Sequence, residues 1–108
     1  MDIQQLRYFT VLATTGNFTR ASTELHLTQP ALSKSISAME AELGLELLAR
    51  TKKGATLTEC GKEFCRFAQS VLTEYDHTCQ RMMEIRENRK NAVNLTVTLP
   101  EIFVQILE

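Results

Sequence analysis

Short polar side chains recur between residues 28 and 37 on one arc of an expected helix, because positions three or four residues apart share a helical face. The arc consists of Gln29, Ser33, Lys34 and Ser37. Amide, hydroxyl and ammonium groups of this kind reach phosphates and base edges in the major groove of DNA. We therefore expect a helix whose outer face contacts DNA.

Residues 28–44 carry the start and stop signals of that helix. Thr28 is an N-cap candidate, Pro30 falls in the first turn, where its missing N–H costs nothing, and Gly44 permits a left-handed stop. The inner face is an apolar stripe at positions i, i+4, i+7 and i+11, which anchors the helix to a core. The stripe is formed by Leu32, Ile36, Met39 and Leu43.

Two further helices are expected before this one. Asp2 and Gln5 have the spacing of a capping box, and Gly16 ends the first helix. The inward stripe of that helix comprises Ile3, Leu6, Phe9, Thr10 and Ala13. The second helix is expected to start near Thr19, and its inward residues are Ala21 and Leu25. Short helices in this order are typical of helix-turn-helix DNA binding.

The segment LELLARTKKGATLT after Gly44 has apolar residues at both ends, cations in the middle and Gly54 at the expected tip of a hairpin. This pattern predicts a two-stranded β-ribbon, or wing, after the third helix. The cations, which could touch the sugar-phosphate backbone or the minor groove, are Arg50, Lys52 and Lys53. The alternative is a solvated surface hairpin with incidental lysines.

The overall charge argues against a nucleic-acid partner. Twelve Lys and Arg residues face 13 Asp and Glu residues, giving a formal net charge of −1, whereas phosphate contacts usually accompany a basic balance. The distribution offsets this objection, because residues 47–57 hold three cations and no acid, while the acids Glu40, Glu42 and Glu46 lie just before them. A nearly neutral protein can still present one basic edge to DNA.

One long helix is expected from Thr58 to about Asn88, because this stretch has no Pro and its only Gly is Gly61. About thirty residues make a rod of roughly 45 Å, too long to lie wholly over the preceding domain. Apolar residues recur along it every 3.5 residues on average, roughly the repeat of a pairing helix, so we expect it to pair with a second copy about a two-fold axis. The expected dimerisation residues are Phe64, Phe67, Val71, Tyr75, Thr78, Met82 and Ile85.

The chain thus divides into three expected parts. Residues 1–57 form the DNA-binding domain, residues 58–91 the linker and dimerisation helix, and residues 92–108 a remainder. In the remainder, NLTVTL at 94–99 alternates like a strand and Pro100 can start a further helix. We interpret residues 92–108 as the start of a truncated effector domain or as an appendage on the dimer.

Cysteine and histidine usage does not indicate catalysis or metal binding. The gaps between Cys60, Cys65 and Cys79 match neither CxxC nor a zinc-site spacing, so we expect buried or half-buried helical thiols, with a redox or metal role as the minor alternative. His26 and His77 are expected in a turn and on a helix surface. No catalytic residues, metal or cofactor are predicted.

The sequence lacks a membrane span and a signal peptide. No apolar run approaches the ~20 residues that cross a bilayer, and the N-terminus MDIQQLRYF lacks a basic-then-apolar layout. We expect a cytoplasmic protein without membrane contact.

Residues 6–61 resemble the N-terminal DNA-binding region of LysR-type transcriptional regulators, and the following helix is similar to the linker helix of that family. The motifs that carry the resemblance are TQPALS at 28–33, the LELG-type AELG at 41–44 and LTECG at 57–61. Two packing positions depart from the family pattern. Leu48 stands where Phe is usual, and Ser22 stands where Ala is usual.

The resemblance implies a mainly α fold, in which a winged helix-turn-helix of three helices and a two-stranded β-ribbon precedes a long dimerisation helix. It matches Gln29, Pro30, Ser33 and Lys34 to positions that face DNA, and Arg50 to the wing arginine. The complete set of expected DNA-binding residues is Thr28, Gln29, Pro30, Ser33, Lys34, Ser37, Arg50, Lys52 and Lys53.

Family members act as dimers or tetramers on imperfect inverted repeats near promoters. Their C-terminal domain senses a small-molecule inducer. That domain is largely absent from these 108 residues, so we expect this chain to bind no effector. The leading hypothesis is sequence-specific binding of double-stranded DNA by a homodimer, which could further assemble into a tetramer. The alternative is an interaction module that pairs through residues 58–88 with a full-length relative and disables it.

Overall fold

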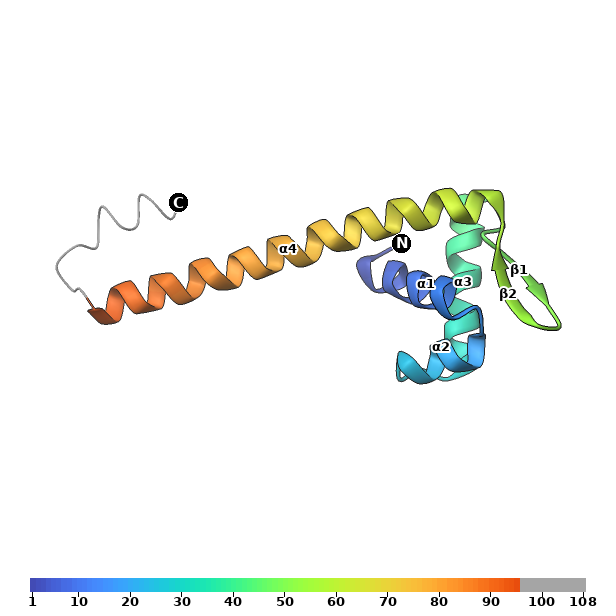
Figure 1. Ribbon diagram of the computed structural model, residues 1–108, viewed down its shortest axis with the longest axis horizontal. Helices are drawn as coiled ribbons and strands as arrows, with labels where there is room; N and C mark the ends of the chain where they lie inside the picture. The colour runs from blue at the N-terminus through green and yellow to red at the C-terminus, as the bar shows by residue number, and fades with distance from the viewer. Residues whose placement is uncertain (96–108) are drawn as a thin grey trace. The chain divides into compact units, whose positions relative to one another are not determined.

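The computed structural model describes residues 1–95, which form four helices and one two-stranded sheet (Figure 1). The elements are α1 (Ile3–Thr15), α2 (Phe18–Glu24), α3 (Gln29–Leu43), β1 (Leu48–Thr51), β2 (Gly54–Leu57) and α4 (Glu59–Leu95). A first compact unit comprises Met1–Leu72 and a second begins at Thr73. The expected winged helix-turn-helix followed by a long helix is therefore confirmed.

Helix α1 begins with the predicted capping box. The Asp2 carboxylate accepts from the Gln5 N–H at 2.8 Å, and the Gln5 side chain accepts from the Asp2 N–H at 3.1 Å. The helix ends at Gly16 with φ +67°. The buried residues are Leu6, Phe9 and Leu12. The predicted stripe was wrong in part, because Leu12 is fully buried whereas Thr10 is only half-buried and donates its hydroxyl to the Arg7 carbonyl.

Helix α2 begins one residue earlier than predicted because Asn17 caps it, accepting from the Arg20 N–H at 3.0 Å. Its buried residues are Ala21 and Ser22, and Leu25 is half-buried. The buried Ser22 hydroxyl donates to the Thr19 carbonyl at 2.8 Å. The hydroxyl that serine adds here, where alanine is usual in the family pattern, therefore has a hydrogen-bond partner within its own helix.

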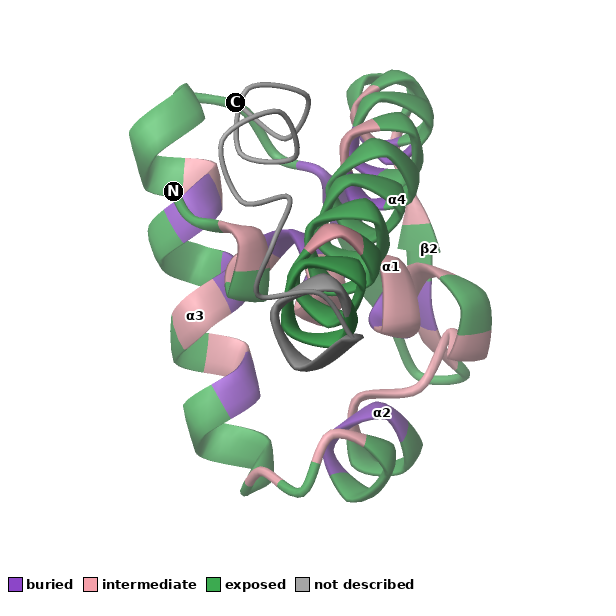
Figure 2. Ribbon diagram, turned by 90° about the vertical axis from the view of Figure 1, so that its left-hand side faces the viewer, coloured by how far each residue is buried: buried purple, intermediate pink, exposed green. Residues whose placement is uncertain are grey.

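Helix α3 has the predicted ends. The Thr28 hydroxyl accepts from the Ala31 N–H at 3.2 Å, Pro30 lies in the first turn, and Gly44 follows with φ +70°. Leu32, Ile36 and Met39 are fully buried, and buried and exposed residues alternate along the helix (Figure 2). Leu43 was predicted to complete the stripe, but it is 38% exposed. It lies in the last turn beside the exposed Gly44 and Leu45, where the described residues cover it only in part.

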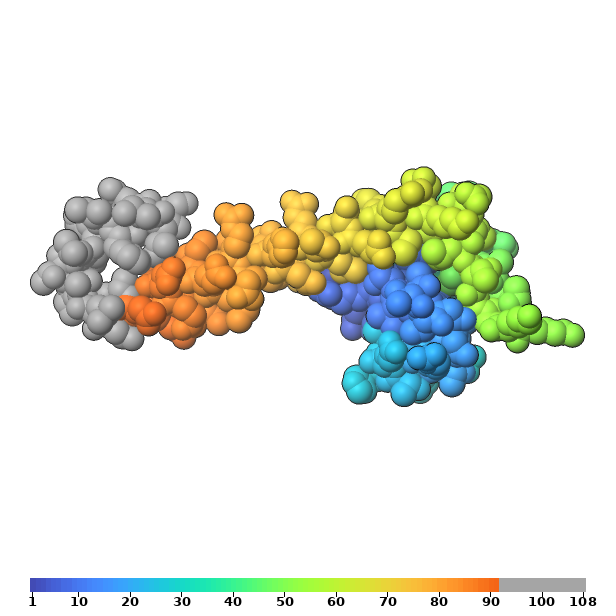
Figure 3. Space-filling view, viewed as in Figure 1, coloured from blue at the N-terminus to red at the C-terminus, as the bar shows by residue number. Residues whose placement is uncertain are grey.

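Strands β1 and β2 pair antiparallel, with Leu48 opposite Leu57 and Thr51 opposite Gly54. The tip of the hairpin is Lys52-Lys53, and Gly54 is the first residue of β2 rather than the tip as predicted. The hairpin stands out from the rest of its unit in the space-filling view (Figure 3). At its base the Ala55 N–H donates to the Gly16 carbonyl at 2.9 Å, so the wing is fixed to the α1–α2 turn.

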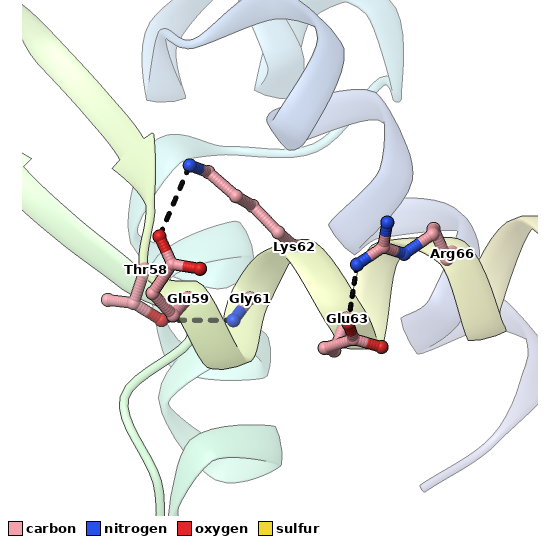
Figure 4. Close-up of polar contacts among 6 residues, drawn as sticks. All are labelled: Thr58, Glu59, Gly61, Lys62, Glu63 and Arg66. Carbon is pink, nitrogen blue, oxygen red and sulfur yellow. Dashed lines mark hydrogen bonds and ion pairs between the residues drawn. The ribbon is translucent and has the colours of Figure 1, made fainter.

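Helix α4 starts at the predicted cap. The Thr58 hydroxyl accepts from the Gly61 N–H at 3.0 Å and donates to the Glu46 carbonyl at 2.7 Å. Ion pairs of Lys62 with Glu59 and of Arg66 with Glu63 follow on its first turns (Figure 4). These pairs are exposed and contribute little to stability.

The far end of α4 differs from the prediction. The helix runs to Leu95 rather than ending near Asn88, because residues 89–95 contain no Pro or Gly that would stop it. The strand predicted at 94–99 is therefore wrong for its first two residues. The rest of that strand and the helix predicted after Pro100 lie outside the described residues.

The core of the first unit joins all its elements. Its apolar members are Leu6, Phe9, Leu12, Ala21, Leu32, Ile36, Met39, Leu47, Leu48, Ala55, Cys65, Ala68 and Leu72. The last three come from α4. Burial was expected for Cys65, but Ala68 and Leu72 were not predicted, because the sequence of α4 also supports a stripe through Phe64 and Phe67. The Phe64 ring lies edge-on to the Phe9 ring, with a centroid separation of 5.3 Å. No helix of the described residues is long and apolar enough to cross a bilayer.

The three cysteines differ in exposure. Cys65 is buried as expected, whereas Cys60 and Cys79 are exposed, contrary to expectation. Burial raises the pKa of the Cys65 thiol, so this group stays protonated at neutral pH. The thiolate is the reactive form of cysteine.

Thiol accessibility can be checked with Ellman's reagent at pH 8. We expect two thiols to react promptly, and the third to react at least tenfold more slowly until denaturant is added. The Cys65→Ala variant should lose the slow phase alone, and Cys79→Ser part of the fast phase. Three equally fast thiols in the native protein would contradict the burial of Cys65.

Candidate nucleic-acid interface

Three segments of the first unit meet around an open groove, which we call the wing groove. They are the start of α2, the start of α3 and the outer part of the hairpin, and the groove has a volume of about 290 Å³. It is lined by Asn17, Phe18, Thr19, Gln29, Arg50, Thr51, Lys52, Lys53 and Gly54. Three of these side chains are cationic and none is acidic. The wing groove therefore favours an anionic ligand.

Arg50 connects the wing to both helices of the helix-turn-helix. Its Nη2 donates to the Ser33 Oγ on α3 at 2.9 Å, and its guanidinium carbon lies 4.4 Å from the centroid of the Phe18 ring on α2. The residue is exposed on the hairpin. The positive charge of Arg50 is thus held between α2 and α3, and its contacts there are more than ten residues away in the sequence.

Gln29 at the start of α3 is oriented by the helix before it. The Thr19 hydroxyl donates to the Gln29 Oε1 at 3.3 Å. Both residues are exposed, so the side-chain amide of Gln29 remains reachable from solvent. An amide NH2 group can donate to acceptors on base edges or to a phosphate oxygen.

The other predicted residues of α3 line its outer side. Pro30, Lys34 and Ser37 are exposed and Ser33 is half-buried, on the side away from the buried Leu32, Ile36 and Met39 stripe. Among the described residues Lys34 has no ion-pair or hydrogen-bond partner. The Thr28 hydroxyl oxygen is engaged in the cap of α3. The outer face of α3 therefore offers one free ammonium and several short polar groups.

Glu40 fixes the start of the wing. Its Oε2 accepts from the Leu47 N–H at 2.7 Å and from the Leu48 N–H at 3.3 Å. The sequence alone indicated only that Glu40 adds negative charge before the wing. The carboxylate instead satisfies two backbone donors and sets where β1 begins, an arrangement that hydrogen bonds to a charged acceptor favour.

Phe18 and Thr19 were not predicted as site residues. They follow a helix cap, and their apolar and hydroxyl side chains have ordinary roles at that position. Only the fold places them beside Arg50 and Gln29. No periodicity in the sequence signals such contacts, because the partners are separated by 32 and 10 residues.

The predicted dimerisation residues fall into two groups. In the first unit, Phe64 and Val71 are half-buried against the core of their own chain, whereas Phe67 is exposed. In the second unit, Tyr75 and Met82 are 44% and 53% exposed, Thr78 is exposed and Ile85 is half-buried. Met83, which lies next to Met82, is also exposed. Exposed large apolar side chains of this kind mark surfaces that can bind a partner.

Residues 3–62 match the model of the family described as bacterial regulatory helix-turn-helix protein, lysR family. The nitrogen assimilation regulatory protein nac of Klebsiella aerogenes is 32% identical over 88% of this chain and 31% of its own length. The uncharacterized HTH-type transcriptional regulator YnfL of Escherichia coli (strain K12) is 30% identical over 97% of this chain and 35% of its own. The chain spans about a third of the length of these relatives.

Two solved complexes with DNA are similar to the described structure. The BenM DBD with catB site 1 DNA has a TM-score of 0.77 at 32% identity, over 80% of this chain and 96% of that chain. The CbnR DBD–DNA complex has a TM-score of 0.74 at 34% identity, over 78% of this chain and 97% of that chain.

Proposed function

The chain belongs to the lysR family of bacterial regulatory helix-turn-helix proteins, and from this premise we propose that it binds double-stranded DNA sequence-specifically as a symmetric dimer and regulates transcription. The observation that carries the proposal is the continuity of the wing groove, with its three cations and no acid, with the outer face of α3. The CbnR and BenM complexes support it, because those similar chains were crystallised with DNA.

The proposed roles follow from chemistry. Gln29 and Ser33 face base edges or phosphates in the major groove, while Lys34 and Ser37 reach the backbone. Thr28 and Pro30 shape the tip of α3 that enters the major groove of DNA. Lys52 and Lys53 contact the sugar-phosphate backbone or the minor groove beside that major groove.

We assign DNA binding to residues 1–57 and pairing of two copies to residues 58–91. A two-fold dimer presents two α3 helices to an imperfect inverted repeat, and such dimers can further assemble into a tetramer. The proposal includes no catalytic role and no effector for residues 1–95. It places the protein in the cytoplasm, where a bacterial chromosome is reached.

Selection of bound sequences from a random duplex library tests the proposal. We expect enrichment of two related half-sites whose centres lie about one helical turn of DNA, or a multiple of it, apart. Absence of any enriched half-site would overturn sequence-specific binding, and a single unrepeated half-site would overturn the two-fold arrangement.

Gln29→Ala should relax base preference at one or two positions of each half-site. We expect a loss of about 1 to 3 kcal/mol on the selected duplex and almost none on a duplex mutated at those positions, because only base readout is removed. Lys52→Ala is the matched control, since loss of a phosphate contact should weaken both duplexes alike. Fluorescence anisotropy titrations measure both. Equal losses on both duplexes for Gln29→Ala would contradict a base contact.

A further inference from the structure

The three cations of the wing groove are held differently. Arg50 has two partners, the Phe18 ring and the Ser33 hydroxyl. Lys52 and Lys53, at the tip of the hairpin, have no hydrogen-bond or ion-pair partner within the described residues. One charge of the groove is therefore restrained by neighbouring side chains, while the other two have no such restraint.

A restrained arginine suits a phosphodiester better than a mobile one. The guanidinium is planar and has five N–H donors in a fixed fork that matches phosphate oxygens. Ser33 takes only one of these donors, so others remain for a ligand in the groove. Fixing the side chain beforehand removes part of the entropy that binding would otherwise cost.

The Phe18 ring is the element that restrains the plane of the guanidinium. An aromatic face within about 6 Å attracts a cation, and Arg stacks on it more readily than Lys; the separation here is 4.4 Å. The ring is half-buried, and part of it packs on the core. Core packing alone does not require an arginine above the exposed part.

We infer that Phe18 is a positioning residue, which together with the Ser33 hydroxyl holds Arg50 ready to bind a phosphodiester of the DNA backbone in the wing groove. The inference rests on the proposed function and adds to it the residue that orients the wing arginine. It also gives Ser33 a second role, as the acceptor that links α3 to the wing.

A double-mutant cycle on the duplex selected above tests the inference. Phe18→Leu keeps an apolar side chain of similar volume and removes the aromatic face. We expect it to weaken binding roughly two- to fivefold in the wild-type background and by less than 1.5-fold in the Arg50→Ala background. Ser33→Ala should also weaken binding less in the Arg50→Ala background than in the wild-type background, and the loss that remains there reports the contact that Ser33 itself makes with DNA. In the Lys53→Ala background, the matched control, the full effect of Phe18→Leu should persist.

The salt dependence of binding distinguishes a positioning role of Phe18 from a purely structural one. Arg50→Ala should lower the slope of log K against log salt by about one, because a phosphate contact is lost. Phe18→Leu should leave the slope unchanged, since the charge remains and only its orientation is lost. Equal weakening by Phe18→Leu with and without Arg50 would overturn the inference.

A conservative arginine variant covers the case in which Phe18→Leu fails to fold. Arg50→Lys keeps the charge but lacks the planar fork, so it should keep the salt slope, weaken binding at least twofold and reduce the effect of Ser33→Ala. Arg50→Lys binding as tightly as wild type would overturn the inference. If the wild-type chain enriches no duplex at all, the proposed function itself is wrong. If it does enrich a duplex but the losses from Phe18→Leu and Arg50→Ala simply add, only the inference about Phe18 is wrong.

Discussion

A chain carrying both Tyr75→Lys and Met82→Lys is expected to become monomeric and to bind a duplex with two half-sites at least a hundredfold more weakly than wild type. Both side chains are about half exposed on α4, and a two-fold axis would bring each introduced charge near its copy. Linking two half-site contacts raises affinity by about 10² to 10⁴ without any new contact. Separation of the copies removes that gain.

Size-exclusion chromatography with light scattering measures the mass, and anisotropy titrations measure the affinity. Binding to a duplex with one half-site should be unchanged, which separates lost pairing from lost folding. Gln80→Lys is the matched control, because Gln80 is exposed on the same helix and a lysine there can still pair with Glu84. A dimeric double variant, or an equal loss on the single half-site, would contradict the assignment of the pairing surface.

Gly54→Ala is expected to lower the free energy of unfolding of the first unit by about 3 kcal/mol, a large effect for one methyl group. The residue has φ +136°, a backbone conformation that strains any side chain. A Cβ there would lie 2.2 Å from the Gly16 carbonyl oxygen, so the hairpin and the α1–α2 turn would have to separate. The same movement would strain the hydrogen bond from Ala55 to Gly16.

Gly44→Ala is the matched control for this change. Gly44 also has a positive φ, +70°, but a Cβ there would meet nothing within 4 Å, so only the backbone penalty of about 1 kcal/mol applies. Thermal unfolding followed by circular dichroism should therefore show a melting temperature that falls on the order of 10 °C or more for Gly54→Ala, and about half that or less for Gly44→Ala. Equal shifts would show that the close approach to Gly16 is not what Gly54 is needed for.

Local chemistry made most of the fold predictable. The cap at Thr28, the stop at Gly44 and the capping box of Asp2 act within a few residues, so the sequence around each one suffices. The predictions failed where tertiary structure decides. Leu43 has the right helical angle, but the described residues leave it 38% exposed, and Ala68 is fully buried because the first turns of α4 lie on the core.

The candidate site was predictable only in its ligand-facing residues. Gln29, Lys34 and Arg50 have side chains whose chemistry suggests DNA contacts, and they could be found from type and spacing. Phe18 and Glu40 act on other parts of the chain: one lies against Arg50 and the other binds two backbone N–H groups at the start of β1. Such roles depend on which distant segments the fold brings together.

The hydroxyl of Ser22 has a consequence for how this lineage can vary. It is buried, yet its hydrogen bond to the carbonyl of Thr19 leaves no orphaned polar atom, so exchange with alanine in either direction should be close to neutral. Serine and alanine codons can interconvert by one nucleotide substitution. Genetic drift at this position is therefore expected to proceed without compensating changes elsewhere in the core.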